Sequence, residues 1–255
     1  MKIGLFIKYE VVDRNFEASF IKKLSSLGFT FDNKNPDIVI TFGGDGTFLK
    51  AVQKYINEID KVKFLCINKG KLGYFSDYKF DELDEALANI NELVPHSYRL
   101  LRASIGKEEI YAVNEIRIEN PFHTLKSEVF IDDEYLESFR GNGLIVSTSL
   151  GSTAYNKSLG GAVVEPASET MQLTEIAPIN NRLYESFGSS LVLSKERTIT
   201  FKGEFSSVLV GYDYLVKNSI NSDEIKIQLS AKKATILNKK DRNYIKRISE
   251  TFIRK

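Results

Sequence analysis

The fold of this chain is decided around one stretch, Asp37-Ile38-Val39-Ile40-Thr41-Phe42-Gly43-Gly44-Asp45-Gly46-Thr47. Residues 37–42 are apolar and β-branched, which is typical of a strand buried on both faces of a parallel sheet. The glycines end that strand. Apolar side chains then recur at helical spacing, on one face of a helix that we expect to begin near Thr47. The stretch therefore predicts a strand, a glycine turn and a helix.

This glycine turn is suited to binding an anion. The N–H groups at the start of a helix carry partial positive charge, and glycines let a phosphate come within hydrogen-bonding distance of the backbone. Asp45 is unexpected there, because phosphates repel a carboxylate. Its presence suggests either that a metal ion offsets this repulsion or that the carboxylate transfers a proton. We interpret Asp45 as functional. The alternative is that it only caps the helix.

Two better-known glycine motifs do not match the turn. A Walker A loop has a Lys-Ser or Lys-Thr pair after its glycines, and no such pair follows here. A dinucleotide-binding fingerprint has a third glycine at the position that Leu49 occupies.

The composition is that of an ordinary globular chain. It has 255 residues, 27% of them charged and 42% hydrophobic, and a formal net charge of +1. This length allows one large or two ordinary domains. A charge close to zero gives no sign of a nucleic-acid-binding surface. Since the sequence has neither a signal peptide nor a long apolar stretch, we expect a cytoplasmic protein without a membrane span.

Cysteine and histidine are scarce, and this excludes several kinds of site. The lone cysteine, Cys66, lies in an apolar run and is expected to be a small buried side chain. His96 and His123 lie far apart in sequence, and neither has a second candidate ligand at helical spacing. The pattern argues against a disulfide framework, a zinc site and a histidine-based catalytic triad, and we assign no metal ligand.

The chain changes its pattern at Pro95. Before that point strands and helices alternate, which predicts an α/β domain with a parallel sheet over residues 1–95. The expected elements are strands at 2–8, 37–42 and 62–67, a short extended piece at 29–31, and helices at 14–27, from Thr47 and at 81–93.

After Pro95 short alternating runs predict an all-β, sandwich-like domain over residues 96–240. The expected strands are 98–105, 109–119, 126–131, 135–140, 143–148, 190–193, 197–202, 207–212 and 224–230. Residues 169–175 fit either a helix or a strand. An amphipathic helix over 241–255 is expected to pack back and to join the first domain.

Three further stretches have a functional interpretation beside a structural one. Residues 68–77 are either a connecting loop whose Tyr74 and Phe75 cover the core or the rim of a nucleotide site. Asn114 and Glu115 interrupt an apolar strand. The one that points inward either forms hydrogen bonds within the protein or binds the hydroxyls of a ribose. The run 141–158 combines glycines with many hydroxyl side chains, more than a plain surface turn requires.

Taken together, these motifs resemble a known family. The turn Gly43-Gly44-Asp45-Gly46-Thr47 alone is shared with diacylglycerol and sphingosine kinases and, less closely, with phosphofructokinases. With Asn68-x-Gly-x-Leu-Gly-Tyr-Phe, Asn114-Glu115, the run 141–158 and Gln172-Leu173-Thr174 followed by Ile179-Asn180-Asn181-Arg182, it is similar to the bacterial NAD kinases, which use ATP or polyphosphate. The motif order extends over almost the whole chain.

The resemblance implies a reaction and a site. ATP-dependent NAD kinases transfer the γ-phosphoryl group of ATP to the 2′-hydroxyl of the adenosine ribose of NAD, with Mg²⁺ or another divalent cation, and give NADP. Asp45 would take the proton from that hydroxyl, and Gly44, Gly46 and Thr47 would form the phosphate site. The implied NAD-binding residues are Asp45, Gly46, Tyr74, Phe75, Asn114, Glu115, Asn142, Thr153, Ala154, Tyr155, Ser158, Ile179 and Asp213.

The resemblance also implies a homodimer or a homotetramer, in which Asn142 and Ile179 fall where a neighbouring subunit completes the site. The chain departs from the family at three places. Asn142 stands where the family usually has Asp, Ser149-Leu150 where it has Pro-Thr or Pro-Ser, and Tyr214 where it has His. The alternatives are a lipid or sugar kinase that shares the glycine turn, and a dinucleotide-binding sensor without catalytic activity.

Overall fold

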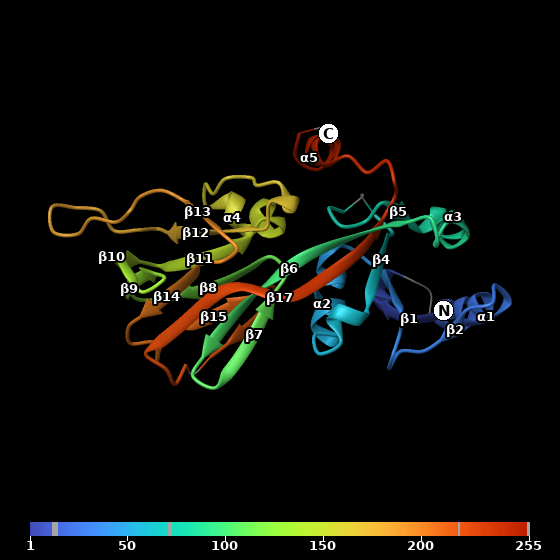
Figure 1. The fold of residues 1–255 in the computed structure, drawn as a ribbon, viewed down its shortest axis with the longest axis horizontal. Helices are drawn as coiled ribbons and strands as arrows, with labels where there is room; N and C mark the ends of the chain where they lie inside the picture. The colour runs from blue at the N-terminus through green and yellow to red at the C-terminus, as the bar shows by residue number, and fades with distance from the viewer. Residues whose placement is uncertain (12–14, 71–72, 219, 254–255) are drawn as a thin grey trace. The chain divides into compact units, whose positions relative to one another are not determined.

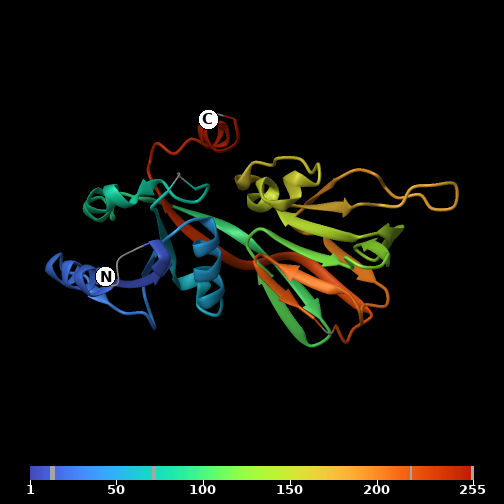
Figure 2. The same cartoon turned by 180° about the vertical axis from the view of Figure 1, so that it is seen from behind.

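The computed structural model describes residues 1–11, 15–70, 73–218 and 220–253. Parts of three predicted segments lie outside the described residues. These are the first residue of the helix expected at 14–27, two residues of the loop at 68–77 and the last two residues of the helix expected at 241–255. The chain divides into two compact units: unit 1 comprises residues 1–97 and 233–255, and unit 2 comprises residues 98–232. Each unit is described by itself, and Figures 1 and 2 show the ribbon from two sides.

Unit 1 is built on a parallel sheet. Its strands pair in the order β2-β1-β3-β4, and β5 and the last part of β17 also pair with β4, in each case in parallel. The elements are β1 (Lys2–Ile7), β2 (Thr30–Phe31), β3 (Ile38–Phe42), β4 (Lys63–Asn68), β5 (Tyr78–Lys79) and β17 (Glu224–Asn238). The predicted α/β domain with a parallel sheet is confirmed.

Helices cover both faces of this sheet, as the alternation of side chains requires. The helices are α1 (Phe16–Ser26), α2 (Asp45–Lys54) and α3 (Leu83–Ala88), with 3₁₀ turns at Tyr9–Val11, Ile59–Lys61 and Phe80–Glu82. Phe42 and Leu65 share one core cluster with side chains of α1 and α3. Phe64, on the opposite face of β4, meets Phe48 of α2 edge to face at 5.5 Å between ring centroids.

Several predicted helix boundaries in unit 1 were wrong. The C-terminal helix begins at Tyr244 rather than at residue 241, and α3 begins at Leu83 rather than at residue 81, after a 3₁₀ turn. Helix α2 begins at Asp45 rather than at Thr47, because Gly44 adopts the extended conformation of an N-cap and the helix starts directly after it. Helix α3 ends at Ala88, although the prediction extended it to residue 93. Asn89 begins a series of turns there, and asparagine favours turns over helix interiors.

Unit 2 contains two antiparallel layers. One is a six-stranded sheet of order β13-β12-β11-β8-β15-β16, formed by β13 (Leu191–Ser194), β12 (Thr170–Ile176), β11 (Gly143–Thr148), β8 (Glu115–Glu119), β15 (Leu209–Tyr212) and β16 (Leu215–Lys217). The other contains β10 (Glu134–Gly141), β9 (Leu125–Ile131), β14 (Thr198–Lys202) and the first part of β17, together with the pair β6 (Val94–Ile105) and β7 (Glu108–Ala112).

One apolar cluster joins the two layers of unit 2. Ile116 and Val146 come from the six-stranded sheet, and Val129, Phe201 and Ile227 come from the other layer; all five are completely buried. Inward-facing side chains from two sheets are the core of a β-sandwich. The predicted all-β, sandwich-like second domain is therefore confirmed.

The structure corrects the predicted strands in several places. Strand β6 begins at Val94 rather than at residue 98, and β16 was not predicted. Residues 109–119 form two strands, β7 and β8, rather than one. The ambiguous residues 169–175 correspond to strand β12. Strand β17 continues beyond its predicted end at residue 230 to Asn238, because its last residues pair with β4 in unit 1, where Thr235 lies opposite Lys63.

The chain ends in helix α5 (Tyr244–Phe252), which belongs to unit 1. The side chain of Asn243 caps it by accepting a hydrogen bond from the N–H of Lys246 at 2.9 Å. Its buried residue is Arg247, whereas Ile245 of the predicted apolar face is 71% exposed. Among the described residues, every helix is too short or too polar to cross a membrane.

The aromatic cluster around Phe42 leads to a test of the core of unit 1. Phe42 is 1% exposed and meets Phe16 and Phe20 at 4.9 and 5.3 Å between ring centroids. We expect Phe42→Ala to lower the free energy of unfolding by about 3–5 kcal/mol, because it removes buried apolar surface and leaves a cavity. Urea denaturation followed by circular dichroism measures this, since the chain has no tryptophan.

Phe122→Ala is the matched control for that experiment, because the Phe122 side chain is 87% exposed. It is expected to change the free energy of unfolding by less than about 0.5 kcal/mol. Equal losses for the two variants would contradict the core described for unit 1.

Candidate active site

Asp45 is the first residue of α2, and its carboxylate does not cap that helix. Gly44 occupies the N-cap position. The two carboxylate oxygens of Asp45 instead accept hydrogen bonds from the backbone N–H groups of Tyr74 at 3.0 Å and Phe75 at 3.2 Å. The alternative that Asp45 is a helix cap is therefore wrong. The carboxylate joins the glycine turn to the loop that follows β4.

The glycine turn is tightly constrained. Gly43 has φ +155°, and a Cβ atom there would lie 2.1 Å from Oγ1 of Thr47. Its N–H donates to the carbonyl of Ile67 at 3.0 Å, which attaches the turn to the end of β4. A side chain at this position would displace Thr47 and the start of α2. Glycine is thus required here for space as well as for conformation.

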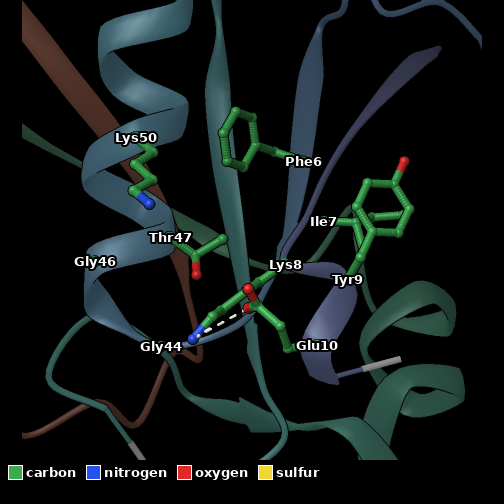
Figure 3. A pocket seen from close by; sticks show the side chains of 9 residues that line it. All are labelled: Phe6, Ile7, Lys8, Tyr9, Glu10, Gly44, Gly46, Thr47 and Lys50. Atoms are coloured by element: carbon green, nitrogen blue, oxygen red, sulfur yellow. Dashed lines mark ion pairs between the residues drawn. The ribbon is translucent and has the colours of Figure 1, made fainter. Parts of the chain in front are cut away.

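A pocket of about 490 Å³ opens beside the start of α2. It is lined by Phe6, Ile7, Lys8, Tyr9, Glu10, Gly44, Gly46, Thr47 and Lys50. Figure 3 shows Thr47 and Lys50 on the side of α2 that faces Phe6 of β1, and Lys8 paired with Glu10 at 3.3 Å. Lysines on two elements and the positive end of a helix favour a polyanion in this pocket.

Lys8 and Lys50 were not among the predicted site residues. A signal for Lys50 was present, because it follows Gly46 by four residues and therefore lies on the same face of α2. Lys8 lies at the carboxyl end of β1, next to the end of β3, where ligands collect on parallel sheets. Only the parallel pairing of these strands shows that Lys8 and the glycine turn share one edge.

The rings of Tyr74 and Phe75 are buried, at 7% and 4% exposure. Phe75 lies 4.6 Å from Phe48 of α2 between ring centroids, and Tyr74 meets Phe75 edge to face at 5.6 Å. Both aromatic side chains therefore cover the core, as one of the two interpretations of this loop expected. Their role in binding NAD stays a prediction.

In unit 2, Asp213 creates the break between β7 and β8. Its carboxylate accepts hydrogen bonds from the N–H groups of Val113 at 2.9 Å and Asn114 at 2.7 Å, and its own N–H donates to the carbonyl of Glu115 at 3.1 Å. These two amides cannot then pair within a continuous strand. Asp213, with φ +48°, is 7% exposed, so the sequence-predicted residues Asn114, Glu115 and Asp213 are brought together.

Glu115 is a buried carboxyl group at the edge of this cluster. It is 5% exposed, and its Oε2 atom has no hydrogen-bond partner among the described residues. Burial, and then the neighbouring Asp213, raise its pKa to about 7, while Arg117 opposes the shift. Arg117 lies 3.6 Å away, between Nη1 and Oε1.

Arg117 is a third residue that was not among the predicted site residues. Its guanidinium carbon lies 5.7 Å from the ring centre of Tyr155, and its Nη1 donates to the carbonyl of Asp213 at 3.5 Å. Glu115, Arg117 and Glu119 alternate along β8 and so share one face, which the period of a strand could have revealed. The Arg117 side chain links the predicted residues Glu115, Tyr155 and Asp213.

The hydroxyl-rich run after β11 packs against this cluster. Oγ1 of Thr148 donates to the carbonyl of Val113 at 2.7 Å and accepts from the N–H of Gly151 at 2.8 Å. A Cβ atom on Gly151 would lie 2.1 Å from the carbonyl oxygen of Asn114. The small residues of this run therefore allow two backbones to approach closely.

The next residues form short helical turns, at Leu150–Thr153 and α4 (Tyr155–Ser158). Ala154 is the residue between them, and its N–H donates to the carbonyl of Gly151 at 2.9 Å. Thr153 and Ala154 are half-buried, whereas Tyr155 and Ser158 are exposed. All four predicted residues thus lie next to the turn that packs against Asn114.

Asn142 and Ile179 lie at the other end of the same strands. Asn142 is exposed and donates its N–H to the carbonyl of Ile176, and Ile179 donates to the carbonyl of Arg140 at 2.7 Å. On β11, Gly143 lies opposite Glu119, whereas Ser147 lies opposite Glu115. Strand geometry separates Asn142 from Glu115 by roughly 15 Å, so unit 2 does not bring them together within one chain.

These features define a class of protein: a two-unit chain whose α/β unit carries an aspartate in a glycine turn, beside a pocket lined by lysines, and whose second unit is β-rich. Residues 8–94 match the model of the ATP-NAD kinase N-terminal domain, and residues 113–239 match that of the ATP-NAD kinase C-terminal domain. The chain belongs to the NAD kinase family.

Relatives named NAD kinase extend over almost the whole chain. That of Lactobacillus gasseri is 36% identical over 99% of this chain and 98% of its own length. That of Lactobacillus johnsonii is 40% identical over 81% of this chain and 79% of its own length. The likeness therefore includes both units.

Solved structures share the fold. The crystal structure of yeast NADH kinase complexed with NADH has a TM-score of 0.85 and 22% identity, over 98% of this chain and 87% of that chain. An NAD kinase from Archaeoglobus fulgidus in complex with ATP has a TM-score of 0.81 and 24% identity, over 98% of this chain and 99% of that chain.

The buried carboxyl group of Glu115 leads to a pH-dependent prediction. Because its pKa is raised to about 7 in the folded protein, the folded state holds this proton more tightly than the unfolded state. The resulting stability is fully present below about pH 4.5 and is lost as the pH rises through about 7. Relative to wild type, Glu115→Gln should therefore gain stability between pH 5 and pH 8, by on the order of 1–3 kcal/mol.

Urea denaturation of wild type and variant at pH 5 and pH 8 measures this difference. Glu134→Gln, which removes an exposed carboxylate on β10, controls for the loss of one negative charge. A stability difference that stays the same at both pH values would contradict a raised pKa at Glu115.

Proposed function

We propose that this chain transfers the γ-phosphoryl group of ATP to the 2′-hydroxyl of the adenosine ribose of NAD and so produces NADP. One observation carries the proposal. The Asp45 carboxylate stands at the first residue of α2, next to a pocket lined by Gly44, Gly46, Thr47 and two lysines. Membership of the NAD kinase family supports the choice of NAD as acceptor.

The donor phosphates bind in the pocket beside α2. Gly44 and Gly46 leave the backbone open to an anion, and Thr47 provides a hydroxyl in the same turn. Lys50 of α2 and Lys8, which directly follows β1 and pairs with Glu10, add positive charge. This arrangement recognises a chain of phosphates rather than a base, so inorganic polyphosphate fits the same chemistry as ATP.

Asp45 acts as the general base for the acceptor hydroxyl. The N–H groups of Tyr74 and Phe75 hold both of its oxygens and so restrict the rotation of the carboxylate. A general base typically contributes about 10²–10⁴-fold to the rate. In phosphoryl transfer, positioning and charge neutralisation contribute most of the remaining acceleration.

Unit 2 supplies recognition of the dinucleotide. Oε2 of Glu115 is a buried acceptor without a partner among the described residues, which suits a ligand hydroxyl or amino group. Arg117, a cation between Glu115 and Tyr155, suits a ligand phosphate or ring. The other residues proposed to contact NAD are Asn114, Thr153, Ala154, Ser158 and Asp213 in unit 2, and Gly46, Tyr74 and Phe75 in unit 1.

A divalent cation such as Mg²⁺ fits this donor set if it arrives with the nucleotide. Among the described residues there is no cluster of three His, Cys, Asp or Glu side chains that could hold a metal ion by itself. Mg²⁺ usually keeps several waters and binds through one or two carboxylates together with substrate phosphates. Glu10 and Asp45 are the carboxylates near the pocket, and the bound ion would neutralise phosphate charge.

We further propose a homodimer or homotetramer in the cytoplasm. Asn142 lies roughly 15 Å along the strands from Glu115, and Ile179 hydrogen-bonds Arg140 at the same end. A second subunit would bring its own Asn142 and Ile179 to the NAD molecule that Glu115 contacts. Free, buried Cys66 is compatible with a reducing compartment, and burial raises its pKa to about 12, which leaves the thiol unreactive.

Asp45→Asn tests the role of the general base. We expect NADP formation from ATP, Mg²⁺ and NAD to fall by at least roughly 10²-fold, because the amide cannot take the proton. Binding of NAD, measured by calorimetry, should be retained. An Asn variant with a turnover close to that of wild type would reject this role for Asp45.

The same assay separates the alternatives. Tight binding of NAD without any NADP would favour a dinucleotide sensor. Phosphorylation of a lipid or sugar, but not of NAD, would favour another kinase that shares the glycine turn.

Lys50→Gln tests the donor pocket. Loss of one ammonium group from a phosphate contact costs about 1 kcal/mol, so we expect the KM for ATP to rise roughly fivefold, and the KM for NAD to change little. Steady-state kinetics measure both constants. Lys22→Gln, an exposed lysine on α1, is the control, and an unchanged KM for ATP in Lys50→Gln would remove Lys50 from the site.

A further inference from the structure

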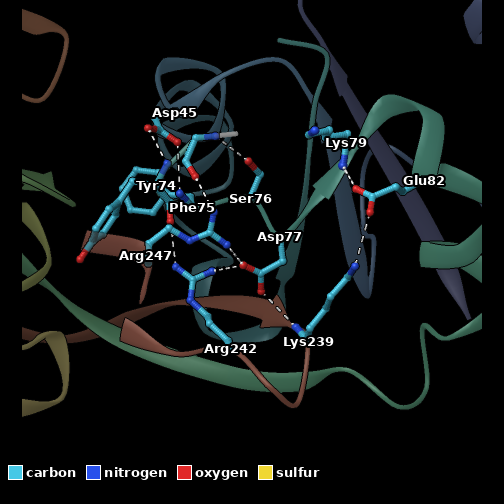
Figure 4. A network of polar contacts seen from close by, with 11 residues as sticks. Asp45, Tyr74, Phe75, Ser76, Asp77, Lys79, Glu82, Lys239, Arg242 and Arg247 are labelled. Atoms are coloured by element: carbon cyan, nitrogen blue, oxygen red, sulfur yellow. Dashed lines mark hydrogen bonds and ion pairs between the residues drawn. The ribbon is translucent and has the colours of Figure 1, made fainter. Parts of the chain in front are cut away.

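The segment that leads into α5 contacts the loop that holds Asp45. Figure 4 shows this network, in which Arg242 and Arg247 approach the loop 73–77 from the C-terminal segment. Both arginines, the loop and Asp45 belong to unit 1. Residues that are separated by about 170 positions in sequence are thus joined by polar contacts.

Asp77 is the centre of this network. Its side chain is 4% exposed. It accepts hydrogen bonds from Nη1 of Arg242 at 2.7 Å, from Nη2 of Arg247 and from the backbone N–H of Lys239 at 3.1 Å. A buried carboxylate with several donors is held in one geometry, because breaking any contact leaves charge uncompensated in a poorly hydrated place.

The same two guanidinium groups also bind the backbone of the loop. Nη2 of Arg242 donates to the carbonyl of Tyr74 at 2.8 Å, and Nη1 of Arg247 donates to the carbonyl of Gly73 at 3.3 Å. The N–H of Tyr74 in turn donates to Asp45 at 3.0 Å. Residue Tyr74 is therefore held from two sides, by Asp45 at its N–H and by Arg242 at its carbonyl.

Helix α5 buries a charged side chain of this network against the rest of unit 1. Arg247 is its buried residue, at 8% exposure, whereas Ile245 and Phe252 are exposed. A helix that served only to cover the core would bury its apolar face. Here the polar residue points inward, to the loop beside the glycine turn.

We propose that Arg242 and Arg247 are positioning residues for the phosphoryl transfer: they hold the loop 73–77 so that its amides orient the Asp45 carboxylate. This inference rests on the proposed function, in which Asp45 is the general base. Neither arginine lines the donor pocket. Their loss therefore acts on the chemical step, through Asp45, rather than on the binding of ATP.

Steady-state kinetics of Arg242→Gln are the first test. We expect kcat for NADP formation to fall by about 10-fold or more, and the KM for ATP to stay within about twofold of wild type. Arg242→Lys should keep less than a third of the wild-type kcat, because one ammonium group cannot contact both Asp77 and the Tyr74 carbonyl as the guanidinium fork does. An unchanged kcat in Arg242→Gln, or full activity in Arg242→Lys, would overturn the proposal.

A double-mutant cycle shows whether Arg242 acts through Asp45. In the Asp45→Asn background, Arg242→Gln should lower kcat by less than about twofold, because the group that it positions is already lost. Two independent losses that multiply would overturn the proposal. If Arg242→Gln fails to fold, Arg247→Gln replaces it, because the ion pair between Arg242 and Asp77 remains in that variant. We then expect kcat to fall by about threefold.

Hydrogen exchange provides a measurement that does not depend on activity. In Arg242→Gln the amides of Tyr74 and Phe75 should exchange about 10-fold faster than in wild type, and an unchanged rate would overturn the proposal. Arg197→Gln, which removes an exposed ion pair with Asp132 at 2.6 Å in unit 2, should leave these amides and kcat unchanged. If the wild-type protein made no NADP, the proposed function would be rejected. The exchange rates alone would then show whether the arginines hold the loop 73–77.

Discussion

The contact on which the site depends is the pair of hydrogen bonds from the Tyr74 and Phe75 amides to the Asp45 carboxylate. It joins the turn after β3 to the loop after β4, so the two loops at this edge of the parallel sheet behave as one structure. A carboxylate that accepts two fixed amides has a defined direction without needing its own helix as a partner. This frees the start of α2 for an anion.

Space constraints reinforce that arrangement in each unit. Gly43 leaves room for Thr47 at the start of α2, and Gly151 lets the turn after β11 lie against the backbone of Asn114. Asp213 has a role in unit 2 that is comparable to that of Asp45 in unit 1, because its carboxylate also binds two backbone amides. In both units an aspartate fixes a loop at the end of a strand, where a ligand can reach it.

The sequence predicted much of the fold because its periodicity is local. The apolar, β-branched run of residues 37–42 and the helical spacing after Thr47 are visible without any partner. The predictions from sequence were wrong where a residue far away in the chain determines the bounds of a strand. Strand β17 is longer than its own pattern indicates because β4 accepts its last residues, and the strand predicted at 109–119 is broken because Asp213 takes two of its amides.

For this protein, the sequence by itself determined the two-part fold, the glycine turn with Asp45 and the family to which the motifs belong, since each depends on residue type and spacing. The tertiary structure alone decided which groups surround them: Lys8 beside the turn, Arg117 beside Glu115, and Arg242 on the Tyr74 carbonyl. The physical reason is that a long cationic side chain acquires its role from the carboxylate or carbonyl that folding places within its reach, and local spacing does not encode that distance.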